Sequence, residues 1–212
     1  MAAAGDGAIL RAVGVGFAYR GQTPIAIDWS ASFGAGVTLL HGDTGSGKST
    51  LLRVLAGELP ASGRLCLAGA DAGQDRAAYR RRVFFREPAS DAFDQFTARA
   101  CIAALNECDA GFDVAARQTL VDGFALAPHL DKPLYMLSTG SKRKVWLAAA
   151  LASGRALILL DEPTGALDAA SIRCLRAALG RRAARPDAAV IVGSSERLEG
   201  VDVRATIELP LR

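Results

Sequence analysis

The feature that most constrains the fold is a short glycine-rich run that follows an apolar segment and precedes a helical pattern. Its residues fit the pattern G-x-x-x-x-G-K-[S/T]. With the threonine that follows, the run consists of Gly42, Asp43, Thr44, Gly45, Ser46, Gly47, Lys48, Ser49 and Thr50. A loop of this kind joins a strand to a helix and turns its backbone N–H groups inward.

Each residue type in this run suits the binding of phosphate. The glycines let the backbone curl around phosphate oxygens, and the N-terminus of the next helix adds partial positive charge. Lys48 places a point charge on the β- and γ-phosphates, and the Ser49 hydroxyl is a magnesium ligand. The alternative, a turn that merely joins a strand to a helix, leaves the lysine and the hydroxyl unexplained. The run therefore predicts a site for ATP with Mg²⁺.

Short apolar segments alternate with helical patterns along most of the chain. Strands are expected at Ile9–Phe17, Ile25–Phe33, Val37–His41, Gly63–Ala68, Val83–Phe85, Ala156–Leu160, Ala188–Val192 and Ile207–Leu209. Helices are expected at Ser49–Leu59 and Ser171–Leu179, and the pattern from about Pro88 to Ala152 is helical with breaks at Gly111, Gly123 and Pro128. Continuous apolar strands between helices indicate a parallel sheet covered on both faces, with the all-helical stretch as an insertion.

Composition excludes several other classes of protein. Half of the 212 residues are hydrophobic, and the four Cys and two His residues lack metal-ligand spacing. The formal charge of +3 gives no support for a nucleic-acid partner. No apolar run reaches the ~20 residues that span a bilayer, and the first residues lack the pattern of an export signal. We therefore expect a soluble, cytoplasmic protein that would rely on another polypeptide for any membrane-spanning part.

A pair of acids follows the apolar segment Ala156–Leu160. A parallel strand that ends beside the phosphate loop would place Asp161 near the magnesium ion. Glu162 would then face the γ-phosphate, where it could polarise the attacking water. The alternative is an acid pair that only caps the next turn, but the glycine-rich run upstream favours the metal and catalytic roles.

Three segments of the chain resemble the ATP-binding-cassette (ABC) ATPase family. They are GDTGSGKSTLLRVLAGEL from residue 42, LSTGSKRKVWLAAAL at 137–151 and LILLDEPTGALD at 157–168. Residues 137–141 are the most specific, because they resemble the LSGGQ signature of the family and precede the acid pair at the family's spacing. The resemblance implies an α/β fold: a P-loop NTPase core with a mostly parallel sheet, flanking helices and an N-terminal antiparallel β subdomain, and an inserted α-helical subdomain. Residues 1–87 and 154–212 would form the β subdomain and RecA-like core, and 88–153 the helical subdomain with the signature.

The resemblance also implies how the site works. Two nucleotide-binding domains, in a homodimer or a heterodimer, would meet head to tail and sandwich two ATP molecules. Ser138 and the Gly140 N–H would contact the γ-phosphate on the partner's phosphate loop, and Asp168 would lie in the D-loop that links the two sites. Tyr19 lies where the family stacks an aromatic ring on adenine, with plain strand packing of Phe17 or Tyr19 as the alternative.

Three elements depart from the family's pattern. The family has Gln after the strand Val83–Phe85, whereas this chain has Arg86-Glu87-Pro88, and a cation there would repel magnesium and attract phosphate. Ser195 stands where the family has its switch histidine, and serine is shorter and never cationic. In the signature, Thr139 replaces a glycine, which would restrict the backbone, and Ser141 replaces Gln. An alignment shift is an alternative for Arg86 only, because residues 186–212 contain no histidine. We predict intact nucleotide binding with slow or partner-dependent hydrolysis by a catalytic set of Lys48, Glu162 and Ser195.

Aromatic and basic residues near these motifs give a less specific signal. Phe84, Phe85, Phe93 and Phe96 lie around the position of Arg86, where ABC transporters receive the membrane subunit. We expect two or three of these rings to pack in the core and the others to be available for docking. The basic run Lys142-Arg143-Lys144 is interpreted as a solvated helix face.

The leading interpretation is an ATP-binding subunit of an ABC transporter, held at the inner face of the cell membrane by a separate membrane subunit. Its general likeness is to short exporter-type ATPases such as the haem-exporter class. A non-transport ABC protein that uses ATP-dependent dimerisation as a regulatory switch is the alternative, favoured slightly by the missing histidine. A P-loop kinase for a small molecule would leave residues 137–141 and 161–168 unexplained.

Overall fold

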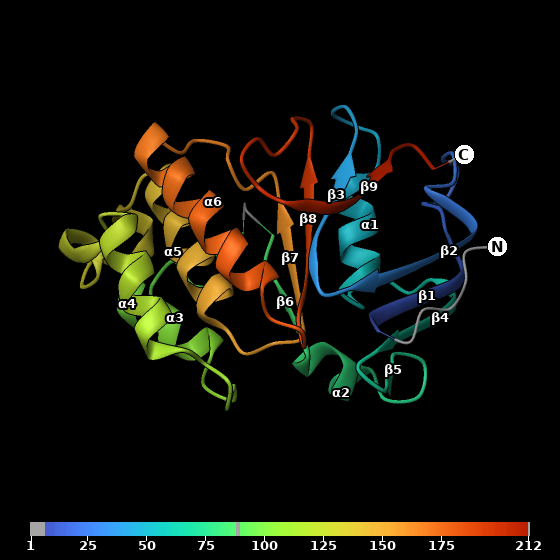
Figure 1. Ribbon diagram of the computed structural model, residues 1–212, viewed down its shortest axis with the longest axis horizontal. Coiled ribbons are helices and arrows are strands. Elements are labelled where there is room, and N and C mark those ends of the chain that lie inside the picture. The colour runs from blue at the N-terminus through green and yellow to red at the C-terminus, as the bar shows by residue number, and fades with distance from the viewer. Residues whose placement is uncertain (1–6, 88–89, 212) are drawn as a thin grey trace.

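The computed structural model describes residues 7–87 and 90–211, which form two sheets and a group of helices (Figure 1). The antiparallel sheet has the order β2 (Ala26–Gly34), β1 (Ala8–Phe17), β4 (Ser62–Leu67), β5 (Ala70–Asp71). The second sheet has the order β6 (Val83–Phe85), β7 (Leu157–Asp161), β8 (Ala189–Ser194), β3 (Gly36–His41), β9 (Val203–Glu208). All neighbours in the second sheet are parallel, which confirms the predicted fold class.

The parallel sheet is buried on both faces because its central strands are apolar at almost every position. Successive side chains of a strand point to opposite faces. Ile158 and Leu160 of β7 join a core with α5 (Thr139–Ala152) and α6 (Ala169–Ala183). Leu157 and Leu159 join a second core with α1 (Lys48–Leu55) and the antiparallel sheet. The sheet therefore separates two hydrophobic cores, one on each of its faces.

The helical group occupies one end of the molecule, at the left of Figure 1. It consists of α3 (Ala98–Leu105), α4 (Val114–Gly123), the 3-10 turns Ala127–His129 and Leu134–Met136, and α5. Residues 145–152 of α5 are all buried, because this helix packs against α3, α4 and α6. The side chains of Thr97, Asp113, Ser138 and Asp168 accept backbone N–H groups at the starts of α3, α4, α5 and α6.

Several boundaries differ from the sequence prediction. Helix α1 ends at Leu55 and not at Leu59, because Gly57 adopts φ 69° and the chain leaves the helix there. The Gly57 and Glu58 N–H groups donate to Val54 and Arg53, the bonding pattern of a left-handed glycine cap. Strand β5 and helix α2 (Arg76–Arg81) were not expected, and α2 has only one buried residue, so it lacks the apolar periodicity of a helix. Strand β9 begins before the predicted Ile207–Leu209, and Pro88 lies outside the described residues.

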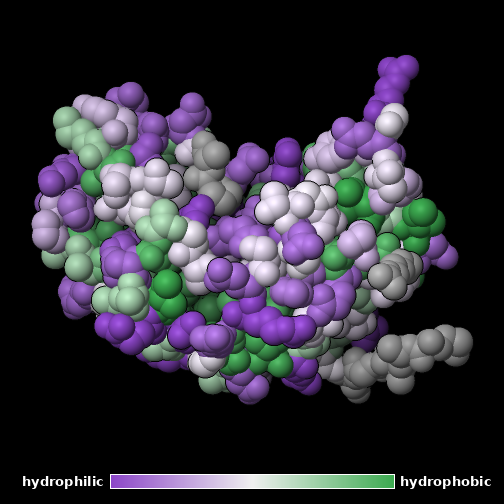
Figure 2. All heavy atoms as spheres, turned by 90° about the horizontal axis from the view of Figure 1, so that it is seen from above, coloured by the Kyte–Doolittle hydropathy of each residue, from purple (hydrophilic) through white to green (hydrophobic). Residues whose placement is uncertain are grey.

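The carboxyl ends of the parallel strands point toward one face of the molecule, the top of Figure 1. Figure 2 shows the molecule from this side, where hydrophilic side chains predominate over the middle and hydrophobic ones are scattered. Ligands of open parallel sheets bind outside the carboxyl ends of the strands. In the part of the chain that the structure describes, no helix is both long and apolar enough to cross a membrane.

Candidate functional site

The glycine-rich run forms a loop between β3 and α1, as the sequence predicts. Gly47 directly precedes α1 with φ 99°, a value that favours glycine, and a Cβ on Gly47 would lie 3.0 Å from the Ile25 side chain. A Cβ on Gly42 would lie 2.8 Å from the Leu209 carbonyl oxygen, so a larger residue would displace the backbone after β9. These glycines are therefore required by the geometry of the loop.

Lys48 lies across the loop and points its ammonium group at the site. Its side chain is only 6% exposed, and Nζ donates to the carbonyl oxygens of Gly42 at 2.6 Å and Asp43 at 3.0 Å. The Lys48 Nζ is also 3.3 Å from Oε1 of Glu162. Two carbonyls and one carboxylate hold the buried ammonium group at the mouth of the loop, where a phosphate would bind.

The acid pair lies beside this lysine. A Cβ on Gly193 of β8 would lie 3.5 Å from Asp161 Oδ1 and 3.5 Å from Lys48 Cβ, so the end of β7 and the start of α1 converge there. Burial raises the pKa of Asp161 above its ordinary value, while a hydrogen bond with the Ser49 side chain opposes the shift. Asp161 Oδ1 is buried and has no hydrogen-bond partner in the part of the chain that the structure describes. A buried carboxylate oxygen without a donor beside a serine hydroxyl is a chemically suitable pair of ligands for Mg²⁺.

Glu162 is held in an unusual backbone conformation. Its φ is 42°, in the left-handed region that residues with a Cβ seldom adopt. The Glu162 N–H donates to the Gly193 carbonyl at 2.8 Å, and Oε1 accepts the Ser195 N–H at 3.0 Å. The structure therefore brings Lys48, Asp161, Glu162 and Ser195 together, but Ser195 takes part through its backbone and its side chain is exposed.

The signature segment begins helix α5. Ser138 Oγ accepts the Ser141 N–H at 3.2 Å and lies 3.0 Å from Ser141 Oγ. Thr139 has an ordinary helical φ as the first residue of α5, so the helix accommodates it without the glycine of the family pattern. A Cβ on Gly140 would lie 2.4 Å from the Ala166 carbonyl oxygen, so the helix start packs closely on the loop after Glu162. Within the described residues, no hydrogen bond or ion pair joins the signature segment to residues 42–49.

The comparison with known proteins decides the family. The family model described as ABC transporter matches residues 28–165. The chain belongs to the ABC transporter family. It is 34% identical over 167 residues to the cytochrome c biogenesis ATP-binding export protein CcmA of Pseudomonas aeruginosa, and the alignment covers 74% of this chain and 78% of that protein. It is 36% identical over 188 residues to the cobalt import ATP-binding protein CbiO of Rhodobacter capsulatus, covering 83% and 66% of the two chains.

A solved structure described as the ATP-binding subunit of an ABC transporter shares the fold. It superposes with a TM-score of 0.75 at 21% sequence identity, over 87% of this chain and 79% of that one. The predicted family and role are confirmed: this chain is an ATP-binding subunit of an ABC transporter.

The basic run of this ABC subunit does not form a solvated helix face, so that interpretation was wrong. Lys142 Nζ pairs with Asp94 at 2.7 Å, and Lys144 Nζ pairs with Asp168 at 2.7 Å. The bond from Lys144 holds the pKa of Asp168 below its ordinary value. Arg143 Nη1 donates to backbone carbonyls of the loop after β7. Consecutive residues lie about 100° apart around a helix, so three in a row cannot share one face.

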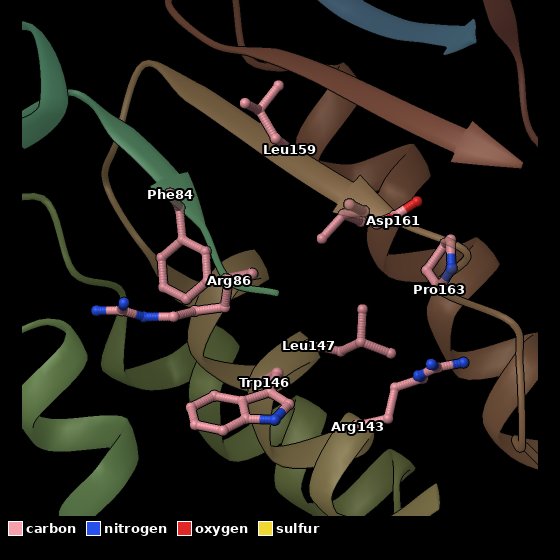
Figure 3. A pocket seen from close by; sticks show the side chains of 10 residues that line it. Phe84, Arg86, Arg143, Trp146, Leu147, Leu159, Asp161 and Pro163 are labelled. Atoms are coloured by element: carbon pink, nitrogen blue, oxygen red, sulfur yellow. The ribbon is translucent and has the colours of Figure 1, made fainter. Parts of the chain in front are cut away.

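Arg86 points away from the acid pair. It lines a hollow between the end of β7 and α5, in which Figure 3 shows its guanidinium directed away from Asp161. The Arg86 guanidinium lies over the Phe93 ring, 5.3 Å from the centroid, and Phe93 packs on Trp146 at 5.9 Å. Phe84 and Phe85 are buried and Phe96 is 43% exposed, which agrees with the expected division between packed and exposed rings.

Tyr19 is half-buried and packs edge-on against Phe17, with ring centroids 5.0 Å apart. The segment between β1 and β2 reaches the phosphate loop through Ile25, which contacts Gly47. Adenine stacking by Tyr19 stays a prediction.

Proposed function

We propose that this chain binds MgATP at the phosphate loop and hydrolyses it to drive a separate membrane subunit. The observation that carries the proposal is the position of Lys48, whose buried ammonium lies between the loop carbonyls and Glu162. ATP-binding subunits of this family are ATPases, and the roles of individual residues here are our assignments. Residues 42–50 would hold the phosphates through their N–H groups, the lysine would neutralise the β- and γ-oxygens, and Tyr19 would stack on adenine.

Mg²⁺ would be held by Ser49 and Asp161. Two protein oxygens leave most of an octahedral shell to phosphate oxygens and water, as is usual for this ion. The bound ion would neutralise charge on the phosphates. Glu162 would polarise the attacking water, because its carboxylate lies on the same side of the loop as Lys48.

Hydrolysis would be slow or dependent on a partner. The Ser195 side chain is exposed and too short to replace an imidazole, and Arg86 is directed away from the acid pair. Ser138 and Gly140 would complete the site of a second nucleotide-binding domain in a head-to-tail homodimer or heterodimer. The chain would then lie peripherally on the inner face of the membrane.

The relatives differ in what they carry, since one is an export protein of cytochrome c biogenesis and the other a cobalt import protein. The proposal is therefore limited to ATP-driven transport. Copurification with a polytopic membrane protein is the expected result. Recovery of only soluble protein, with a partner that binds in an ATP-dependent way, would favour the regulatory-switch alternative.

Three substitutions test the site. Glu162→Gln should bind ATP with Mg²⁺ as tightly as the wild type and lose turnover, because only the water-polarising carboxylate is removed. Lys48→Ala should lose binding, and Lys132→Ala, at an exposed lysine far along the chain, is the matched control. Calorimetry measures the binding of ATP with Mg²⁺, and phosphate release measures turnover. A Glu162→Gln variant that turns over at the wild-type rate would contradict the assignment.

A further inference from the structure

The loop that carries Glu162 is held by a side chain from the signature helix. Arg143 Nη1 donates to the Glu162 carbonyl at 3.0 Å and to the Gly165 carbonyl at 2.5 Å. Figure 3 shows Arg143 reaching from α5 toward the loop at Pro163. The Arg143 side chain is half-buried, so both bonds are partly shielded from water.

The loop needs such support because its backbone is strained. Glu162 has φ 42° and Ala166 has φ 59°, and neither is a glycine. Left-handed residues with a Cβ persist where surrounding contacts fix them. The peptide groups that flank the Glu162 Cα are held on both sides, since its N–H donates to Gly193 of β8 and its carbonyl accepts from Arg143. Among the described residues, no other side chain donates to the carbonyls of Glu162 and Gly165.

We propose that Arg143 is a positioning residue for Glu162. It fixes the left-handed turn and so directs the carboxylate at Lys48 and the Ser195 N–H, the contacts seen in this structure. If the clamp is lost, the Glu162 backbone relaxes to a commoner φ and the carboxylate leaves the lysine. Arg143 lies in the second turn of α5, the helix that Ser138 caps, so the clamp also ties the signature segment to the turn at Glu162.

This inference rests on the proposed role of Glu162 in hydrolysis. The inference assigns Arg143 a specific role, whereas its sequence context, a run of three basic residues, indicated only a solvated helix face. Guanidinium suits the task, because a single NH₂ group can donate to two carbonyls while the planar fork limits the ways in which it can turn.

Two variants remove the clamp from opposite sides. Arg143→Met removes the donors and keeps much of the apolar stem. In Gly165→Ala the new Cβ would lie 2.2 Å from Arg143 Nη1 and would displace the guanidinium, at a position where φ is not left-handed. Arg143→Lys is the conservative variant, and Lys142→Met is the matched control, because Lys142 pairs with Asp94 and not with this loop.

The kinetic result expected for Arg143→Met and Gly165→Ala is a fall in kcat of about tenfold or more, with the Kd for MgATP within about twofold of the wild type. Arg143→Lys should recover part of the rate, and Lys142→Met should resemble the wild type. A role in stability alone would lower the melting temperature and weaken binding together. Wild-type kcat in both clamp variants would overturn the proposal.

A second readout does not require turnover. Amide hydrogen exchange of residues 162–168 should become faster in Arg143→Met and Gly165→Ala and stay unchanged in Lys142→Met, since only the first two free the loop. Unchanged exchange in the clamp variants would overturn the proposal. The proposed function is tested separately by Glu162→Gln. If Glu162 has no role in hydrolysis, this variant would retain the turnover of the wild type, whatever the hydrogen exchange of the clamp variants shows.

Discussion

Burying the carboxylate of Asp161 lowers the stability of the protein without nucleotide, and a bound metal ion would offset this loss. Burial raises the pKa of Asp161 above its ordinary value, so the ionised form is less favourable in the folded chain than in the unfolded one, and Oδ1 has no hydrogen-bond partner among the described residues. Asp161→Asn should therefore raise the unfolding free energy without nucleotide by about 1 kcal/mol, because a neutral amide costs less to bury than a carboxylate of the same shape. The same variant should lose the additional stabilisation by Mg²⁺ with ATP, which thermal denaturation measures.

Asp168→Asn is the control, because it should change the stability of the protein in the opposite direction. The pKa of Asp168 is lowered because Lys144 donates to its carboxylate, so its ionised form stabilises the fold at neutral pH. Neutralising Asp168 should lower the melting temperature. An Asp161→Asn protein less stable than the wild type without nucleotide would show that the carboxylate has a partner in solution.

Ser195 gives a prediction about rate. Its backbone N–H already contacts Glu162, so a longer side chain at this position would project from a fixed point beside the turn at Glu162. Ser195→His should raise kcat by about tenfold, since a positioned imidazole is worth this much or more. Ser195→Ala should keep the wild-type rate, because the contact of Ser195 with Glu162 is made by the backbone N–H, which the substitution leaves in place. A histidine variant no faster than the alanine variant would contradict this account of slow hydrolysis.

At the scale of secondary-structure elements, a close backbone contact joins the end of α5 to the segment between α3 and α4. A Cβ on Gly154 would lie 2.3 Å from the Gly111 Cα and 2.6 Å from its carbonyl oxygen, and backbone atoms cannot swing aside. Gly154→Ala should lower the unfolding free energy by about 1–3 kcal/mol, the usual range for overpacking. Denaturant titration measures the change.

Gly180 is the matched control within α6. A Cβ there would meet no atom of the described residues within 4 Å, so Gly180→Ala should raise the unfolding free energy by roughly 0.5–1 kcal/mol through helix propensity. The same substitution thus has opposite effects at the two positions. Equal effects would mean that the Gly154 contact relaxes in solution.

The elements that sequence reasoning predicted well are those with a strong local signal. Strands β3, β7 and β8 are continuous apolar runs, and the loop before α1 has glycines at positions that require them. Helix α2 was missed because its start depends on one capping carboxylate, Asp75, and little apolar periodicity follows. The Arg143 clamp was also missed, since its carbonyl partners belong to a turn whose position is set only when α5 packs beside β7.

At the scale of the whole molecule, two separate segments are proposed to bind nucleotide, the phosphate loop and the signature segment. Lys48, Asp161 and Glu162 lie together at the ends of the parallel strands, whereas Ser138 is exposed and, within residues 7–87 and 90–211, makes no hydrogen bond to the phosphate loop. Both segments are polar, so they gain little by associating without a ligand. A bound ATP would supply the charge that both segments recognise.

Dimerisation should therefore depend on ATP and on blocked hydrolysis. With Mg²⁺ and ATP, Glu162→Gln should sediment with about twice the 22.1 kDa mass of one chain, and with ADP it should remain a monomer, because ADP lacks the γ-phosphate that would bridge the two halves. Adding Ser138→Arg should return the protein to a monomer while leaving ATP binding intact, because the change lies on the signature and not on the phosphate loop. Dimers that form equally with ADP, or that survive Ser138→Arg, would show that the chains associate through another surface.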